Sequence, residues 1–351
     1  MRGEIREQPA ALERTLDAEW KNAQELRRRF QQHRPRFLML AARGTSDNAA
    51  QFGRYLIEIS TGIPVSLAAP SVSTLYRARL DLKDAAVVTI SQSGESTDAN
   101  IVLEDAKAAG AFTIGITNEA GSSLARLAEH TFLVRAGKER SVAATKTYTG
   151  QLLCFYLLAH ALGAPIEHDA LRRICEWTSA ALELEPEIGA RAERYCFMRH
   201  AVCVGRGVNY CNSLEFALKL METCYIVAER FSSADLLHGP IAMLDRSFPA
   251  FLFCPAGVTW NPLCEVLEKL RSIGADLLLI TDRSNKPAAY ATEQRALTID
   301  AALAHQGDLP EDVYTPIPYI IPAQLLAATL AEVKGLDPDR PRTLNKVTQT
   351  I

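Results

Sequence analysis

The sequence lacks the patterns by which most metal and nucleotide sites are recognised. Its eight cysteines form no C-x-x-C pair, and its seven histidines form no H-x-x-x-H pattern, so no metal site is predicted. A Walker A motif is absent. In "GRGVNY", Tyr210 stands where a dinucleotide fingerprint needs its third glycine, which disfavours dinucleotides and nucleoside triphosphates. We therefore expect neither a metal nor an organic cofactor.

Charge of one sign and long apolar runs are also scarce. The formal net charge is −3, so no global basic field favours nucleic acid. The run Arg27–Arg29 lies among Glu19 and Glu25 in a helical pattern, which is typical of a solvated helix face. The most apolar stretch, "QLLCFYLLAHALGAP", is too short to span a bilayer and contains His160. We expect no nucleic-acid or membrane partner.

The cysteines and the first residues bear on the compartment. Cys154, Cys203 and Cys254 lie in apolar runs, which is typical of buried, reduced thiols. The start, "MRGEIREQPA", has no apolar core of the kind that a secretory signal needs. Both observations predict a cytoplasmic protein.

What the sequence does contain is an alternation of strand-like and helix-like segments. "RFLMLAA", "DAAVVTI", "AFTIGIT" and "HTFLVRA" read as strands, with helices predicted from Ser46 to Ile59 and from Glu95 to Ala109. An amphipathic helix precedes them, and helices follow from about Thr145 to Met198 before "AVCVGRG" restarts the pattern. Alternation of this kind predicts an α/β fold with a doubly wound parallel sheet.

The restart is a repeat. Arg43–Gly44 and Arg206–Gly207 each follow a strand, and Gly94 and Gly257 each end a strand-to-helix loop. Both glycine pairs give the same offset of 163 residues (207 − 44 and 257 − 94). Two tandem copies of one α/β domain are therefore predicted. The expected boundaries are an N-terminal helix at 1–34, domains at 35–165 and 199–335, a helical connection at 166–198 and a tail at 336–351.

Two hydroxyl-rich loops follow strands of the first copy, at Arg43–Ser46 and Ser91–Ser96. Ligands of an open parallel sheet bind beyond the carboxyl ends of its strands. A helix N-terminus there offers unpaired N–H groups to an anion. Gly94 would let the backbone approach closely. Simple helix capping is the alternative, but two such loops in one unit favour a phosphate dianion held by the hydroxyls of Ser46, Ser91, Ser93 and Ser96.

These motifs carry a resemblance. "SQSGES", "ARGTS" and "SVAATKTYTGQ" resemble the sugar isomerase (SIS) domain family, and the tandem arrangement resembles the isomerase half of glucosamine-6-phosphate synthase. "ARGTSD" and "ETCYIVAERFSSADLLHGP" are more similar still to short SIS-type glucosamine-6-phosphate deaminases. The resemblance implies two flavodoxin-like domains and a six-carbon sugar phosphate as ligand.

The resemblance also assigns binding residues. It implies that the sugar phosphate is bound by Thr45, Ser46, Ser91, Gln92, Ser93 and Ser96, with Val142 and Ala143 lining the sugar. Two positions depart from the synthase pattern: Arg43 stands where the synthase has cysteine, and Ala144 where it has serine. One contact to a sugar hydroxyl is thereby changed.

A candidate catalytic group lies on the helix "NSLEFALKLMETC" of the second copy. Glu215, Lys219 and Glu222 fall at i, i+4 and i+7 on one face. A solvated ion-pair stripe is the simple interpretation, but the apolar residues between them indicate burial. The resemblance implies that Glu222 carries a proton between C2 and C1 and that Lys219 lies near the sugar O1.

The resemblance places two further residues at the site. His238 would open the sugar ring from the neighbouring subunit, which implies a homodimer with shared active sites. The tail would fold over the site and bring Lys346 to it.

The synthase begins with a glutamine-hydrolysing domain whose nucleophile is a cysteine after the initiator methionine, whereas Arg2 follows Met1 here. We therefore expect release of ammonia: glucosamine 6-phosphate and water give fructose 6-phosphate and ammonia. A deglycase for fructosamine 6-phosphates remains open. A non-catalytic sugar-phosphate-binding protein is the third interpretation. As a DNA-binding regulator it would need more than a single N-terminal helix.

Overall fold

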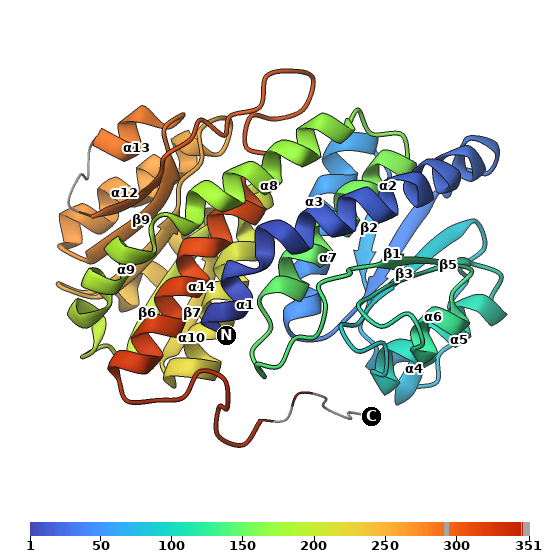
Figure 1. The fold of residues 1–351 in the computed structure, drawn as a ribbon, viewed down its shortest axis with the longest axis horizontal. Coiled ribbons are helices and arrows are strands. Elements are labelled where there is room, and N and C mark those ends of the chain that lie inside the picture. Colours follow the sequence, from blue (N-terminus) through green and yellow to red (C-terminus); the bar gives the residue numbers. More distant parts are fainter. Residues whose placement is uncertain (291–294, 345, 347–351) are drawn as a thin grey trace. The chain divides into compact units, whose positions relative to one another are not determined.

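The computed structural model describes residues 1–290, 295–344 and 346. They divide into two compact units. The N-terminal unit comprises Ala10–Glu139 and Lys146–Arg172, together with Lys346, and the C-terminal unit comprises Met1–Pro9, Arg140–Thr145 and Arg173–Leu344 as far as described. Each unit contains one five-stranded parallel sheet with helices packed around it (Figure 1). The predicted α/β class with two tandem parallel-sheet domains is confirmed.

The sheet of the N-terminal unit has the strand order β2-β1-β3-β4-β5. Its strands are β1 (Phe37–Ala41), β2 (Val65–Leu67), β3 (Ala85–Ile90), β4 (Phe112–Thr117) and β5 (His130–Leu133). Its helices are most of α2 (Gln8–Gln32), with α3 (Thr45–Thr61), α4 (Ser71–Thr74), α5 (Thr97–Ala108), α6 (Ser123–Leu127) and α7 (Lys146–Ala161). Every residue of β3 is buried, as expected for a central strand covered on both faces.

The sheet of the C-terminal unit has the order β10-β9-β8-β6-β7. Its strands are β6 (His200–Gly205), β7 (Val227–Ser232), β8 (Pro249–Phe253), β9 (Asp276–Asp282) and β10 (Ala296–Ile299). Its helices include α1 (Arg2–Arg6), α9 (Glu185–Ala192), α10 (Tyr210–Cys224), α11 (Ser233–Leu237), α12 (Trp260–Ile273), α13 (Lys286–Tyr290) and α14 (Pro316–Val333). Helix α8 (His168–Leu182) begins in the N-terminal unit and ends in the C-terminal unit.

The two sheets have the same topology, because β6, β7, β8, β9 and β10 occupy the places of β1, β2, β3, β4 and β5 in turn. Helix α3 packs against α7, and its counterpart α10 packs against α14. The offset of 163 residues carries Ser96, the residue before α5, onto Thr259, the residue before α12. The predicted repeat is therefore present residue by residue at the starts of α5 and α12, whereas α3 begins at Thr45 and α10 begins at Tyr210, two residues beyond the offset.

Two helices form the core beside the sheets. All of α7 is buried, as is α14 from Pro316 to Ala331. Among the described residues, α14 alone is long and apolar enough to cross a membrane. Since 89% of its apolar window is buried inside the structure, it has the burial of a core helix.

All eight cysteines are free. Six are buried, Cys264 is half-buried and Cys196 is exposed. Burial raises the pKa of the Cys224 thiol to about 11 and raises the pKa of Cys203 further. The prediction of buried thiols is confirmed for Cys154, Cys203 and Cys254, the three cysteines that it names.

Candidate functional site

The first hydroxyl-rich loop joins β1 to α3. Gly44 adopts a positive φ of 57°, and the helix begins at Thr45. Ser46 is buried in the first turn, where its Oγ accepts a hydrogen bond of 3.0 Å from Gln151 Nε2 of α7. A buried amide thus fixes the Ser46 hydroxyl at the carboxyl end of the sheet.

The second loop folds as a tight turn after β3. Ser91 Oγ accepts from the Gly94 N–H at 3.1 Å, and Ser93 Oγ accepts from the Glu95 N–H at 3.2 Å. Gly94 has a φ of 67°, and a Cβ there would lie 2.2 Å from Ser122 Oγ. Glycine is therefore required at this position because the backbone lies against Ser122. The predicted close approach of Gly94 to a phosphate stays a prediction. The Gln92 carbonyl accepts from the Asn118 N–H, which joins this loop to the one after β4.

The helix after this turn begins two residues later than predicted, at Thr97 and not at Glu95. The reason is that Ser96 is extended, with ψ 114°, and serves as the N-cap residue. Its side chain makes no capping hydrogen bond. The hydroxyl of Ser96 therefore lies at a helix N-terminus and does not cap it. Simple helix capping does not explain the presence of Ser96 at this position.

An ion pair joins the two loops. Arg43 Nη2 and Nε lie 2.6 and 3.1 Å from Asp98 Oδ2. Asp98 belongs to the first turn of α5 and is 1% exposed, while the Arg43 side chain is half-exposed. The guanidinium neutralises a carboxylate that would otherwise repel an anion at this helix start. In the sequence Arg43 was only a departure from a family pattern, and nothing there indicated Asp98 as its partner.

The C-terminal unit holds the candidate catalytic group on α10. Lys219 Nζ lies 2.6 Å from Glu222 Oε2 and 3.3 Å from Glu215 Oε1. Glu215 and Lys219 are fully buried, and the Glu222 side chain is 23% exposed. The prediction of burial is therefore confirmed, and a solvated stripe is excluded.

The charges of this group follow from its geometry. Burial alone would lower the pKa of Lys219, but the carboxylates of Glu215 and Glu222 more than offset burial and raise it. Lys219 therefore stays an ammonium. Of the two carboxylates, only that of Glu222 reaches solvent, so Glu222 is the carboxylate that a ligand can contact.

The described part of the tail packs along the same unit. The Val142 N–H donates to the Asp339 carbonyl at 3.3 Å. The Arg342 N–H donates to the Tyr225 hydroxyl at 2.8 Å, and its guanidinium lies over the Tyr225 ring. Tyr225 is the residue directly after α10. The tail therefore links the segment of Val142 and Ala143 to the end of the helix that carries Glu222.

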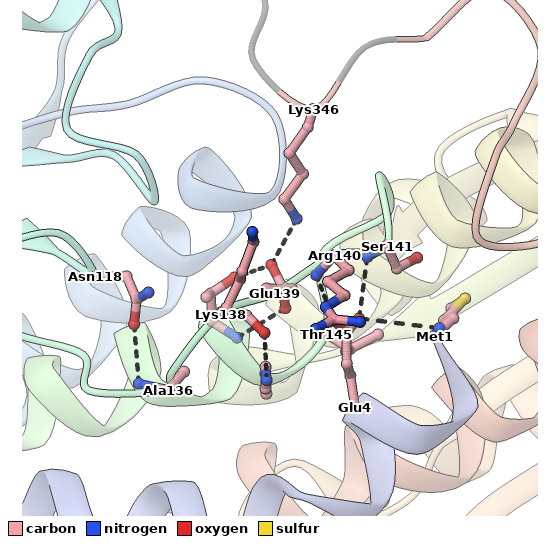
Figure 2. A network of polar contacts seen from close by, with 12 residues as sticks. Met1, Glu4, Asn118, Ala136, Lys138, Glu139, Arg140, Ser141, Thr145 and Lys346 are labelled. Atoms are coloured by element: carbon pink, nitrogen blue, oxygen red, sulfur yellow. Dashed lines mark hydrogen bonds and ion pairs between the residues drawn. The ribbon is translucent and has the colours of Figure 1, made fainter.

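Lys346 is held by a carboxylate that sequence reasoning missed. Lys346 Nζ lies 2.9 Å from Glu139 Oε2. Figure 2 marks this contact with a dashed line. The Glu139 side chain is fully buried, and it also accepts from Thr147 Oγ1 at 2.7 Å and from the Thr147 N–H at 3.2 Å. Glu139 thus caps the start of α7 and binds the tail lysine at once. The only sequence signal was an acidic residue just before "SVAATK".

His238 stands apart from the α10 group. It is exposed directly after α11, and its N–H donates to the Asp235 carbonyl. Across the part of the chain that the structure describes, its side chain makes no hydrogen bond or ion pair with Lys219 or Glu222. The predicted residues therefore fall into separate places: the hydroxyl loops of the N-terminal unit, the α10 group, the segment of Val142 and Ala143, the Lys346–Glu139 pair, and His238.

The tandem parallel sheets, with hydroxyl-lined loops at the carboxyl ends of β1 and β3, define the class as a double SIS-domain protein. The SIS domain model matches residues 33–161 and 198–331. The chain belongs to the SIS domain family.

Individual relatives agree with this assignment. Glutamine–fructose-6-phosphate aminotransferase (isomerizing) from Methanothermobacter thermautotrophicus is 34% identical over 343 residues, which cover 98% of this chain and 56% of that protein. The chain spans about half the length of the curated relatives it matches. The resemblance to the isomerase half of the synthase is confirmed.

Solved structures show the same fold. The C-terminal domain of glucosamine-fructose-6-phosphate aminotransferase from Francisella tularensis superposes with a TM-score of 0.84 at 29% identity, covering 96% of each chain. Glucosamine-6-phosphate deaminase from Thermotoga maritima superposes with a TM-score of 0.74 at 20% identity, covering 96% of this chain and all of that one. At the second identity the likeness concerns the fold alone.

Proposed function

We propose that this chain is a phosphosugar aldose–ketose isomerase that removes the amino group at C2, converting glucosamine 6-phosphate and water to fructose 6-phosphate and ammonia. The observation that carries the proposal is the α10 group. It presents one solvent-reaching carboxylate, Glu222, beside the buried ammonium of Lys219, which also pairs with Glu215.

In the proposed reaction the open-chain aldose loses its C2 proton to Glu222. The electron pair moves to form the C1–C2 enol, and the Lys219 ammonium stabilises negative charge that develops at O1. Glu222 returns the proton to C1 while the nitrogen lone pair forms the C2–N double bond. A proton then passes from the nitrogen to O1, which leaves a neutral imine at C2. Water adds to the imine carbon, and ammonia leaves with the C2–N electron pair. His238 is the proposed ring-opening acid and base, since histidine exchanges protons near neutrality.

The N-terminal unit is proposed to hold the 6-phosphate, with Thr45, Ser46, Ser91, Gln92, Ser93 and Ser96 as donors. Ser96 supports this role because its hydroxyl lies at the start of α5 and makes no capping hydrogen bond. The N–H groups and the dipole of the helix favour an anion there. Val142 and Ala143 are proposed to line the sugar, and Lys346 to act from the tail. Cytoplasmic location, the expected domain boundaries and a homodimer with shared sites belong to the same proposal.

The test is release of ammonia and of ketose phosphate across a panel of glucosamine 6-phosphate, other aminohexose phosphates and fructosamine 6-phosphates. Equimolar ammonia and fructose 6-phosphate from glucosamine 6-phosphate is the expected result. Release of glucose 6-phosphate from a fructosamine 6-phosphate alone would identify a deglycase. Binding without turnover of any member would identify a sugar-phosphate-binding protein.

The relatives favour one further candidate function, because their names describe transfer of an amino group to fructose 6-phosphate. An isomerase core supplied with ammonium would then form glucosamine 6-phosphate from fructose 6-phosphate. Running the assay in both directions, with ammonium as nitrogen source, compares the two. Faster turnover toward the amino sugar would replace the deaminase with a synthase core.

A further inference from the structure

A buried amide lies behind the first hydroxyl-rich loop. Gln151 belongs to α7, every residue of which is buried, and is itself 1% exposed. Its Nε2 donates to Ser46 Oγ at 3.0 Å, while its Oε1 is buried and accepts no hydrogen bond from the described residues. A buried amide that is only half paired costs stability. An apolar side chain of similar volume would pack there without that cost, so stability does not explain the amide.

Close packing of α3 and α7, both in the N-terminal unit, holds the amide at the loop. A Cβ on Gly53 of α3 would lie 2.3 Å from the Phe155 ring of α7. The ring centroids of Phe52 and Tyr156, from the same two helices, lie 5.1 Å apart. Because side chains packed this closely leave no room for the helices to slide, the amide keeps its place beside the loop.

The direction of this hydrogen bond decides where the Ser46 proton can go. A serine hydroxyl has one proton to donate and two lone pairs with which to accept. The amide N–H of Gln151 uses a lone pair of Ser46 Oγ and cannot take its proton. Among the described residues, the Ser46 hydroxyl donates no hydrogen bond, although its side chain is buried in the first turn of α3. Ser46 therefore keeps its proton for an acceptor that these residues do not supply.

The serines of the second loop have the same polarity. Ser91 Oγ accepts from the Gly94 N–H, and Ser93 Oγ accepts from the Glu95 N–H. Each of these hydroxyls, like that of Ser46, thus accepts from an N–H group and has a proton left to donate. Such a set of donors suits a phosphate dianion, whose oxygens only accept. The backbone orients the hydroxyls of the second loop, whereas a side chain orients that of Ser46.

We propose that Gln151 is a positioning residue of the phosphate site: by donating to Ser46 Oγ, it directs the Ser46 hydroxyl proton to the phosphate of the substrate. Gln151 acts through Ser46 and makes no substrate contact of its own. The inference rests on the proposed function, because it takes the hydroxyl loops to hold the 6-phosphate. It adds a residue from α7, outside both loops, to the machinery of that site.

A double-mutant cycle on the KM for glucosamine 6-phosphate tests the proposal. Gln151→Met keeps the volume of the side chain and removes the amide. It should raise KM by about 3- to 10-fold, the usual effect of one hydrogen bond, and leave kcat unchanged, because the phosphate is remote from C1 and C2. In a Ser46→Ala background the same substitution should have no further effect, whereas in a Ser93→Ala background it should act by its full factor. Equal factors in both backgrounds, or an unchanged KM in the single variant, would overturn the proposal.

A second substitution separates positioning from packing, and it replaces Gln151→Met if that variant does not fold. Gln151→Glu keeps the shape and a hydrogen bond to Ser46, but its carboxylate accepts the Ser46 proton. If Gln151 only joins α3 to α7, this variant should be milder than Gln151→Met. The proposal predicts the reverse, with KM raised by about 10- to 100-fold, and most of that rise should vanish in the Ser46→Ala background. A rise of equal size with and without the Ser46 hydroxyl would mean simple charge repulsion and reject the proposal.

Two controls keep the outcome clear. Asn285 is a buried amide of the C-terminal unit whose Nδ2 donates to the carbonyls of Cys254 and Pro255. Asn285→Leu should lower the melting temperature and leave KM unchanged. Ser46→Ala alone tests the proposed function: if the calorimetric affinity for glucosamine 6-phosphate stays the same, the phosphate site is misplaced and this inference fails with it. If Ser46→Ala weakens binding and the Gln151 variants do not, only the positioning role of Gln151 fails.

Discussion

At the scale of single residues, substitution of Ser93 tests the proposed phosphate loop directly. Its Oγ accepts from the Glu95 N–H, which orients the hydroxyl proton for donation to another acceptor. Ser93→Ala should raise the KM for the phosphosugar by about 10- to 100-fold, because a hydrogen bond to a charged group is worth about 1.5–3 kcal/mol. Steady-state kinetics measure this.

The control for Ser93 is Ser272→Ala, a hydroxyl on α12 that donates to the Lys269 carbonyl. It should leave KM unchanged. Calorimetric affinities that are equal for phosphorylated and unphosphorylated sugar would show that the loop does not bind phosphate.

The buried ion pairs of Lys219 predict how the stability of the folded protein depends on pH. Its pKa is raised in the folded protein above the usual value of 10.5. The stabilisation of the folded protein by the Lys219 ion pairs is therefore complete below about pH 10.5. It is lost as the pH rises through the pKa that Lys219 has in the folded protein. We expect the wild-type melting temperature to fall above this pH more steeply than that of Lys219→Met, as calorimetric scans between pH 8 and 12 can measure.

The same variant isolates the buried charges. Lys219→Met leaves the fully buried Glu215 carboxylate without its ammonium, and breaking a buried pair in this way costs about 3–5 kcal/mol. Adding Glu215→Gln should restore part of the loss. If both variants are as stable as the wild type, the group is not closed to water as described.

At the scale of elements, the tail is held to the start of α7 by Glu139. Glu139→Gln keeps an acceptor for the Thr147 N–H but removes the charge that binds Lys346. We expect trypsin to cut the tail after Arg342 about 3- to 10-fold faster, because a partly buried charge-assisted contact is worth roughly 1 kcal/mol. Mass spectrometry of the timed digest measures the rate.

Lys346→Gln is the partner variant for this prediction. It should have the same effect, and the double variant should cut no faster than either single variant, because both remove one contact. Additive rates, or a fall in melting temperature large enough to explain them, would mean that the pair does not hold the tail.

Elements with a strong periodic signal could be predicted from the sequence, and those without one could not. The buried strands β1, β3 and β4 are mostly apolar runs, and α10 carries its charged residues at helical spacing, so the sequence predicts these elements. Strand β2 has three residues, and β7 is an edge strand in which only Ala228 and Ser232 are buried. Edge strands have one solvated side, which weakens the pattern that reveals a strand.

The residues of the candidate site could be predicted only where they lie close to one another in the sequence. The hydroxyl loops and the α10 face each fit within a few residues, so spacing was enough. The partners of Arg43 and Lys346 lie 55 and 207 residues away. Contacts over such separations depend on the packing of the unit, and no single-sequence pattern encodes them.

At the scale of the whole molecule, the proposed function assigns His238 to the active site of a second subunit. Within the described residues, His238 is exposed and makes no hydrogen bond or ion pair with Lys219 or Glu222. If His238 acts across a subunit boundary, then mixing inactive Glu222→Gln with inactive His238→Ala should restore part of the activity. Random pairing of the two variants leaves half of the dimers mixed, each with one intact site, so about a quarter of the wild-type activity is expected. Enzyme assays after co-refolding measure it. A fully active monomer in analytical ultracentrifugation would contradict this prediction.

The central claim is that Glu222 carries a proton between C2 and C1 of a phosphosugar. The most direct test is deuterium exchange, followed by NMR, in glucosamine 6-phosphate and fructose 6-phosphate incubated in D₂O with wild-type protein or Glu222→Gln. The account predicts solvent deuterium at C2 or C1 with the wild type. With Glu222→Gln it predicts loss of that exchange and a turnover lower by about 10²–10⁴-fold, the usual contribution of general acid–base catalysis, while the sugar phosphate still binds. Exchange by Glu222→Gln at the wild-type rate would contradict the account.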